Sequence, residues 1–173
     1  MVVTTTSRPE STEFSRAMGA THTVNHREDI VSQIRELKLQ VPIRYVFITH
    51  STARYLAPVA AVVAPFAKVC SIVQTKDFPM YGTKFMAKSL TFIWELMGTG
   101  PWYGVEVDHS GETLAKLAKL LDDETIKCHL TQKLPLTRDG LRKAHEMVES
   151  GGVIGKIGLG VDVDGTSAEE AFA

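Results

Sequence analysis

Ser7 and Arg8 are the residues whose types and position most clearly point to chemistry. They follow the β-branched run at 2–6 and precede Pro9, which is typical of the first turn of a helix. At such a junction in dinucleotide-binding folds, a carboxylate pairs with a ribose 2′-hydroxyl, whereas an arginine accommodates a 2′-phosphate. No carboxylate occurs before Glu10, so the junction predicts a phosphate-binding site. The alternative is a helix-capping serine beside a solvent-exposed arginine.

Signatures of other catalytic classes are missing from the sequence. It contains no G-x-G-x-x-G turn, no G-x-S-x-G elbow and no H-E-x-x-H zinc helix. Gly151 and Gly152 precede an expected strand, and the segment at 98–101 is typical of a turn. Cys70 and Cys128 are far apart and have no C-x-x-C neighbour. We therefore expect no metal site, no disulfide framework and a reducing, cytoplasmic location.

Composition and charge exclude several partners. The chain has 173 residues, of which 44% are hydrophobic, and 19 Lys+Arg against 20 Asp+Glu leave a net charge of −1. This balance favours neither nucleic acid nor an anionic membrane surface. The longest apolar run, at 55–67, contains two prolines and is too short to span a bilayer. The N-terminus has neither the basic nor the apolar region of a signal peptide.

The first two-thirds of the chain alternates strand and helix patterns, which predicts a doubly wound parallel α/β sheet. Strands are expected at 2–6, 23–25, 43–49, 67–73 and 89–95, and helices at 10–18, from 29 onward and from about 52 to 64. Ser51 or Thr52 can cap the third helix. The strand at 43–49 is apolar at nearly every position, which is typical of a parallel strand covered on both faces. A single crossover helix separates it from the equally apolar strand at 67–73, so we expect the two strands to be adjacent and central.

The last third changes character. A leucine-rich stripe predicts a helix at 111–122, followed by a strand at 129–136, a helix at 138–149 and a strand at 155–161. The polar, small-residue segment from 162 to 173 is expected to be a frayed tail.

Four segments, in this order and spacing, together resemble one family. They are TSRPE at 6–10, MGATHTVNHRED at 18–29, the KSLTF and ELM stretches within 88–97, and the AHE, ESG and GKI stretches within 144–157. Residues 2–161 are similar to the C-terminal half of medium-chain dehydrogenase/reductases, in the zinc-type alcohol dehydrogenase-like branch close to quinone oxidoreductases.

The resemblance implies a partial Rossmann fold that lacks its first βα unit. Residues 1–125 would form part of a nucleotide-binding domain, residues 126–163 a strand–helix–strand segment that packs on a missing GroES-like catalytic domain, and residues 164–173 a tail. The chain would then begin at the family's second Rossmann strand, as a truncated gene model, an expressed fragment, or a product completed by another chain.

The resemblance also implies an activity, namely NADPH-dependent hydride transfer to a small carbonyl, enone or quinone substrate, in a homo-oligomer. The isolated chain is expected to be inactive and to bind no zinc. The alternative is a non-enzymatic remnant that serves as a dimerisation or nucleotide-binding module.

Ten residues are implied to contact the cofactor. Ser7 and Arg8 would hold the 2′-phosphate with His26 nearby, residues at the ends of the next two strands would flank the nicotinamide half, and Phe92 would lie beside the ring. The strand-end residues are Thr49, His50, Ser71, Ile72 and Val73, and Lys156 is a further candidate.

Overall fold

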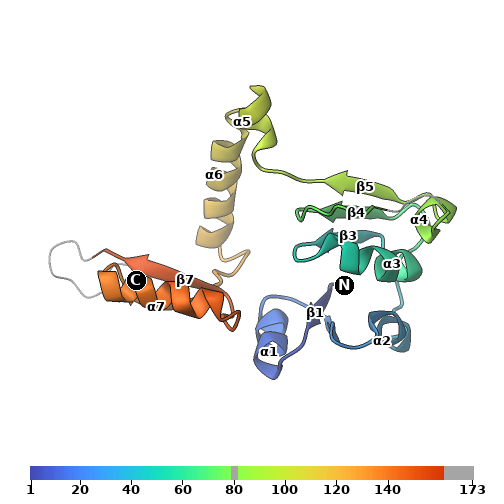
Figure 1. Cartoon of the computed structure of the whole chain (residues 1–173), viewed down its shortest axis with the longest axis horizontal. Helices are drawn as coiled ribbons and strands as arrows, with labels where there is room; N and C mark the ends of the chain where they lie inside the picture. The colour runs from blue at the N-terminus through green and yellow to red at the C-terminus, as the bar shows by residue number, and fades with distance from the viewer. Residues whose placement is uncertain (79–81, 162–173) are drawn as a thin grey trace. The chain divides into compact units, whose positions relative to one another are not determined.

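The computed structural model describes residues 1–78 and 82–161, so the expected tail lies outside the described residues. Strands and helices alternate along the chain as predicted (Figure 1). The strands are β1 (Val3–Thr6), β2 (His22–Asn25), β3 (Tyr45–Ile48), β4 (Lys68–Ser71), β5 (Thr91–Trp94), β6 (Leu130–Pro135) and β7 (Lys156–Gly160). The helices are α1 (Pro9–Ala17), α2 (Ile30–Glu36), α3 (Thr52–Val62), α4 (Lys84–Ala87), α5 (Thr99–Tyr103), α6 (His109–Asp122) and α7 (Arg138–Glu149).

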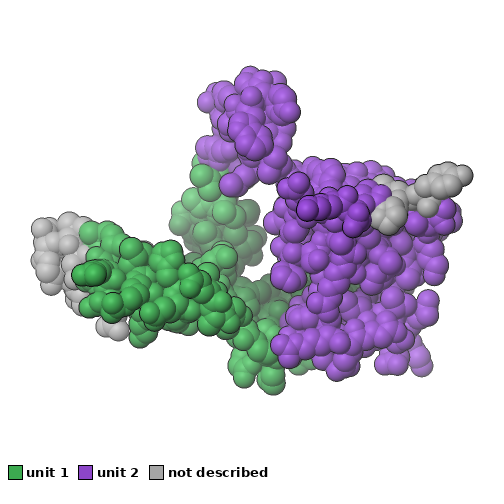
Figure 2. Space-filling view, viewed as in Figure 1, with its two compact units in different colours: residues 1–4, 8–23, 114–173 green, residues 5–7, 24–113 purple. Residues whose placement is uncertain are grey.

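The chain divides into two compact units (Figure 2). Unit 1 consists of Met1–Thr4, Arg8–Thr23 and Leu114–Ala173, and unit 2 of Thr5–Ser7 and Val24–Thr113. Each is described by itself.

A three-stranded parallel sheet forms the centre of unit 2. Its strand order is β3-β4-β5, and the register places Ile48 opposite Ser71 and Ser71 opposite Trp94. Parallel neighbours need a crossover connection, and α3 supplies it between β3 and β4. The predicted parallel pairing of these two strands is confirmed, but β3 lies at an edge of this sheet and β4 alone is central.

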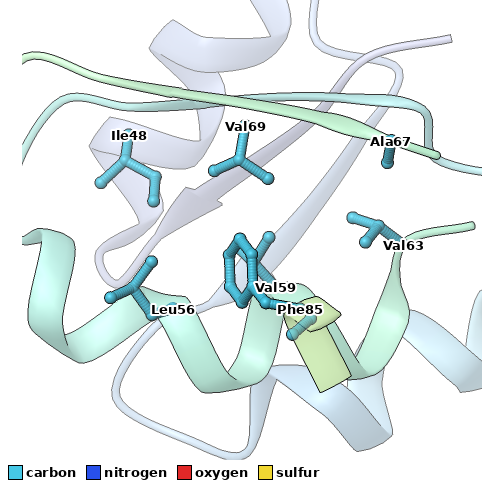
Figure 3. Close-up of a cluster of buried hydrophobic side chains, with 8 residues drawn as sticks. Ile48, Leu56, Val59, Val63, Ala67, Val69 and Phe85 are labelled. Atoms are coloured by element: carbon cyan, nitrogen blue, oxygen red, sulfur yellow. The ribbon is translucent and has the colours of Figure 1, made fainter. Parts of the chain in front are cut away.

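Helix α3 covers one face of this sheet and builds the core (Figure 3). Its buried residues Leu56 and Val59 share a cluster with Val69, which is fully buried, and with Phe85 of α4. Apolar residues one turn apart place a single helix face against the strands, which is the amphipathic pattern seen in the sequence.

The exposure of one face of β3 contradicts the prediction that this strand is covered on both faces. Tyr45 is 76% exposed and Phe47 62% exposed, whereas Ile48 is buried against α3. Alternate side chains of a strand point to opposite faces, so only one face of β3 is covered among the described residues. The expectation of burial on both faces was wrong because apolar composition cannot show which faces have a helix to pack against.

Strands β1 and β2 form a separate two-stranded sheet. The N–H of His22 donates to the carbonyl of Val2 at 3.1 Å, and that of His26 to Thr6 at 3.0 Å. The constant offset along both strands shows that they run parallel. Helix α1 connects them, completing a β–α–β unit that follows the predicted ranges closely.

In unit 1, β6 and β7 form a parallel pair connected by α7. Thr137 caps α7, with its hydroxyl oxygen accepting from the N–H of Gly140 at 3.1 Å. Gly140 is required by packing, since a Cβ there would lie 2.0 Å from the carbonyl oxygen of Pro135. The strand–helix–strand order predicted for this region is confirmed.

Two short helices, α4 and α5, were not foreseen. The segment expected to be a turn at 98–101 instead begins α5 at Thr99. Within residues 1–78 and 82–161, no helix is long and apolar enough to cross a membrane.

Candidate functional site

The junction after β1 begins the candidate site. Arg8 is the N-cap residue of α1, and its carbonyl accepts hydrogen bonds from the hydroxyls of Ser11 and Thr12 at 2.9 and 3.0 Å. The Arg8 guanidinium donates to the carbonyl of Gly152 at 3.3 Å, within unit 1. Ser7 is half-buried and belongs to unit 2. A single Nη2 bond leaves other N–H groups of Arg8 able to meet a ligand.

The turn after β2 is held by the side chain of Asn25. Its amide Oδ1 accepts from the N–H of Arg27 at 3.0 Å, and its Nδ2 donates to Glu28 at 2.7 Å. Gln33 bonds both the N–H and the carbonyl of Asn25, at 2.7 and 2.9 Å. This turn therefore presents His26, which is half-buried, in a defined position at the carboxyl end of β2.

The carboxyl ends of β3 and β4 bring several expected site residues together. Because Ile48 and Ser71 are paired in register, the residues that follow them lie at the same edge of the sheet. Thr49, His50 and Ile72 are exposed there, and Val73 is half-buried. Open α/β sheets bind ligands at such carboxyl ends.

A buried hydroxyl network joins these two strand ends. Thr52 is 1% exposed and Ser71 is fully buried, and their hydroxyl oxygens lie 2.7 Å apart. The Thr52 hydroxyl also donates to the carbonyl of Val73, while the N–H of Val73 donates to Ser71 Oγ at 3.2 Å. If the Ser71 hydroxyl donates to the Thr52 hydroxyl oxygen, both hydroxyls and both main-chain groups of Val73 have hydrogen-bond partners. The carbonyl oxygen of Ile48, 3.3 Å from Ser71 Oγ, is a second acceptor for the Ser71 proton. The network therefore holds the main chain of Val73.

Arg54 links the end of β2 to the start of α3. Its Nη2 donates to the carbonyl of His26, and its Cζ lies 5.7 Å from the centre of the Tyr55 ring. Burial holds the pKa of His26 below its usual 6.5, and the positive charges of Arg54, Arg27 and His50 lower it further.

Phe92 lies away from this edge, and Lys156 belongs to the other unit. Phe92 pairs in register with Val69, midway along the strands, and its ring packs edge-on against Phe78 with a centroid distance of 4.4 Å. Trp94, 4.8 Å from Phe92 by ring centroids, is the β5 residue level with Ser71. Lys156 begins β7 in unit 1 and is exposed. Their proposed contacts with a cofactor stay predictions.

Neither cysteine forms a disulfide: Cys70 is half-buried and Cys128 exposed. Across residues 1–78 and 82–161, no group of three or more His, Cys, Asp or Glu side chains is placed to bind a metal ion. The residues described do not fit a metal centre.

Two residues at this edge were missed by the sequence reasoning. Thr52 was expected as a possible helix cap, but Ser51 takes that position without a side-chain cap bond, and the Thr52 hydroxyl bonds to β4 instead. Arg54 carried no signal at all, because its partner is 28 residues away in the sequence.

The chain is similar to proteins described as dehydrogenases. Residues 18–159 match a family model described as zinc-binding dehydrogenase. A zinc-type alcohol dehydrogenase-like protein of Staphylococcus aureus strain COL is 30% identical over 163 residues, covering 92% of this chain and 47% of that protein.

Solved structures show the same fold. A protein of Rhizobium etli CFN 42, assigned as a zinc-dependent alcohol dehydrogenase, superposes with a TM-score of 0.77 and 32% identity, covering 90% of this chain and 46% of that one. JamJ enoyl reductase superposes with a TM-score of 0.69 at 16% identity, covering 91% and 46%. The chain thus spans about half the length of its relatives, and the predicted partial Rossmann fold is confirmed.

Proposed function

The chain belongs to the zinc-binding dehydrogenase family, in its alcohol dehydrogenase-like branch, and we propose from this that it carries the NADPH-binding part of an oxidoreductase. The reaction would be hydride transfer between the nicotinamide ring and a small carbonyl, enone or quinone substrate. Residues 1–125 would supply part of the cofactor domain and residues 126–163 a segment of the catalytic domain. We further propose that the protein is a homo-oligomer in the cytoplasm. Its two unpaired cysteines are consistent with a reducing compartment.

One observation carries this proposal: the carboxyl ends of β3 and β4 are adjacent and in register. They place Thr49, His50 and Ile72 together on an exposed edge, with Ser71 and Val73 fixed beneath by the hydroxyl network. A nicotinamide ring needs such a rigid main-chain edge, because hydride transfer requires close and oriented approach of the two carbons.

The residues that we propose to bind phosphate also suit a phosphorylated cofactor. The described chain offers Arg8 and Ser7 after β1, and His26 beside Arg54 after β2. Since the sequence contains no glycine-rich phosphate turn, the pyrophosphate would lack its usual backbone donors. The described residues do not fit zinc, and no step is assigned to it.

Titration of the purified chain with NADPH and NADH tests the proposal. A charge-assisted bond from Arg8 to the 2′-phosphate contributes about 1.5–3 kcal/mol, which gives a preference for NADPH of about 10- to 150-fold. Arg8→Ala should remove most of it, whereas exchange of the exposed Arg138 for alanine should not. Equal affinities in the unchanged protein would refute the assignment.

A quinone and enone panel tests catalysis. We expect turnover no faster than background for the chain alone, because the pyrophosphate has no glycine-rich turn to bind it. Turnover at about 1–1000 per second, typical of enzymes, would contradict this expectation.

A second candidate is a non-enzymatic dimerisation module. The segment around β5 and α5 favours it, since Trp94, Met97, Trp102 and Tyr103 are 49%, 90%, 75% and 78% exposed. Large exposed apolar side chains are typical of interfaces. If the chain is dimeric by light scattering and binds neither cofactor, this second function replaces the first.

A further inference from the structure

The main chain leaves the sheet of unit 2 at Val73, just past the carboxyl end of β4. The N–H of Ile72 still donates to the carbonyl of Ile48 in β3, at 3.2 Å. The main-chain groups of Val73 turn instead to side chains: its N–H donates to Ser71 Oγ at 3.2 Å, and its carbonyl accepts from the Thr52 hydroxyl. Two buried hydroxyls therefore set the direction in which the chain leaves the sheet.

Thr52 is held firmly by the core. It is the first residue of α3, it is 1% exposed, and its hydroxyl oxygen lies 2.7 Å from that of Ser71. A β-branched side chain has few χ1 rotamers, which restricts the direction of its hydroxyl. Helix α3 is fixed in turn, because Leu56 and Val59 are buried against the sheet. The main chain of Val73 is thus tied to the core through Thr52.

Burial prevents Thr52 from contacting a ligand itself. With 1% of its surface exposed, it can act on a bound molecule only through the main chain that it holds. That main chain borders the exposed edge, where Ile72 is 47% exposed and Val73 is half-buried. Both polar main-chain groups of Val73 already have partners within the protein. The network therefore donates nothing to a ligand, but it sets where the surface formed by Ile72 and Val73 lies.

A second contact anchors the same segment further along the chain. The Phe78 ring packs edge-on against Phe92 of β5, with 4.4 Å between the ring centroids. Residues 73–78 are thus anchored at their start by Thr52 and at their end by Phe78. Loss of the Thr52 hydroxyl releases the start of the segment, which is the part that borders the exposed edge.

We propose that Thr52 is a positioning residue for the nicotinamide half of a bound cofactor, because its buried hydroxyl holds the main chain against which the ring packs. This inference rests on the proposed function, in which the ends of β3 and β4 flank the nicotinamide. A ring that gains its affinity by packing is sensitive to small shifts, since a gap of about 0.5–1 Å loses a quarter to a half of the contact energy. The adenosine half, which contacts the residues after β1 and β2 in the proposed function, should not depend on Thr52.

Two ligands that differ in the nicotinamide ring test this inference on the full chain. They are NADPH and 2′-phospho-ADP-ribose, which lacks the ring, and calorimetric titration measures the affinity for each. Thr52→Val should weaken NADPH binding about 5-fold, the effect of one net hydrogen bond, and should change 2′-phospho-ADP-ribose binding less than about 2-fold. Thr91→Val, at an exposed threonine of β5, is the matched control and should change neither affinity.

Thr52→Ser separates the role of the hydroxyl from that of packing. Serine keeps the hydroxyl and loses one methyl group, so its affinity for NADPH should stay within about 2-fold of that of the unchanged protein. Without ligand, the Val73 amide should exchange its hydrogen faster in Thr52→Val than in Thr52→Ser, because Ser71, which accepts from this amide, loses its partner. Retained binding of 2′-phospho-ADP-ribose shows that Thr52→Val is folded.

The outcomes separate this inference from the proposed function. If Thr52→Val weakens both ligands equally, or if Thr52→Ser binds NADPH as weakly as Thr52→Val does, Thr52 has a structural role alone and the inference is overturned. It is also overturned if Thr52→Val binds NADPH as tightly as Thr91→Val does, or if the unchanged protein binds both ligands equally; the cofactor site itself then stands. If the unchanged protein binds neither ligand, the proposed function fails and this inference fails with it.

Discussion

Replacing Thr52 by valine should weaken the connection between the carboxyl ends of β3 and β4. Valine has nearly the shape of threonine, so the change removes the hydroxyl with little change in packing. Val73 then loses the donor to its carbonyl, and Ser71 can turn its proton to the carbonyl of Ile48, 3.3 Å away. Among residues 1–78 and 82–161, Thr52 is the one donor seen for the Val73 carbonyl.

The expected loss follows from these bonds. One net hydrogen bond contributes about 1 kcal/mol, and leaving a buried acceptor without a donor costs about 1–3 kcal/mol. Because Val73 is half-buried, we expect a total of about 2 kcal/mol in the free energy of unfolding. With an m-value of about 2 kcal/mol per molar urea, the unfolding midpoint falls by about 1 M.

Urea unfolding of Thr52→Val, followed by circular dichroism, measures this loss. Thr91→Val is the control, because Thr91 is exposed on β5, and it should stay within about 0.5 kcal/mol of the unchanged protein. The double variant with Ser71→Ala should show a coupling energy of about 0.5 kcal/mol or more between the two hydroxyls. A Thr52→Val midpoint equal to that of the control, or zero coupling, would refute the reasoning.

Two further predictions concern a glycine pair and the pH dependence of stability. Gly111→Ala should stabilise the protein by about 0.5–1 kcal/mol, because a Cβ at this position of α6 meets nothing within 4 Å. Gly140→Ala should destabilise the protein, because its Cβ would lie 2.0 Å from the carbonyl oxygen of Pro135. Thermal unfolding compares the two variants, and equal shifts in Tm would contradict the packing argument. The lowered pKa of His26, caused by burial and then by neighbouring positive charges, means that just below pH 6.5 the unfolded chain binds more protons than the folded one. The free energy of unfolding should therefore fall as the pH drops through about 6.5. The fall should be smaller in His26→Asn than in His145→Asn, a control at an exposed histidine. Urea unfolding midpoints at about pH 7.5 and 5.5 measure the difference.

Local pattern was sufficient for most elements. The helix at 138–149 matches α7 residue for residue, and the strands at 129–136 and 155–161 contain β6 and β7. These elements are readable because capping residues, glycine turns and apolar periodicity act over only a few neighbouring residues. The family resemblance added the expectation of a partial Rossmann fold, which local patterns do not contain.

Only the tertiary structure decided which residues are neighbours in space. Phe47 and Ile48 look equally apolar in sequence, yet one is 62% exposed and the other 4%, since burial depends on which face of β3 meets α3. The Thr52–Ser71 bond spans 19 residues and the Arg54–His26 bond spans 28. Such contacts depend on how strands pair and helices cross over them, so the hydroxyl network and the Arg54–His26 bond could not be read from the chain one segment at a time.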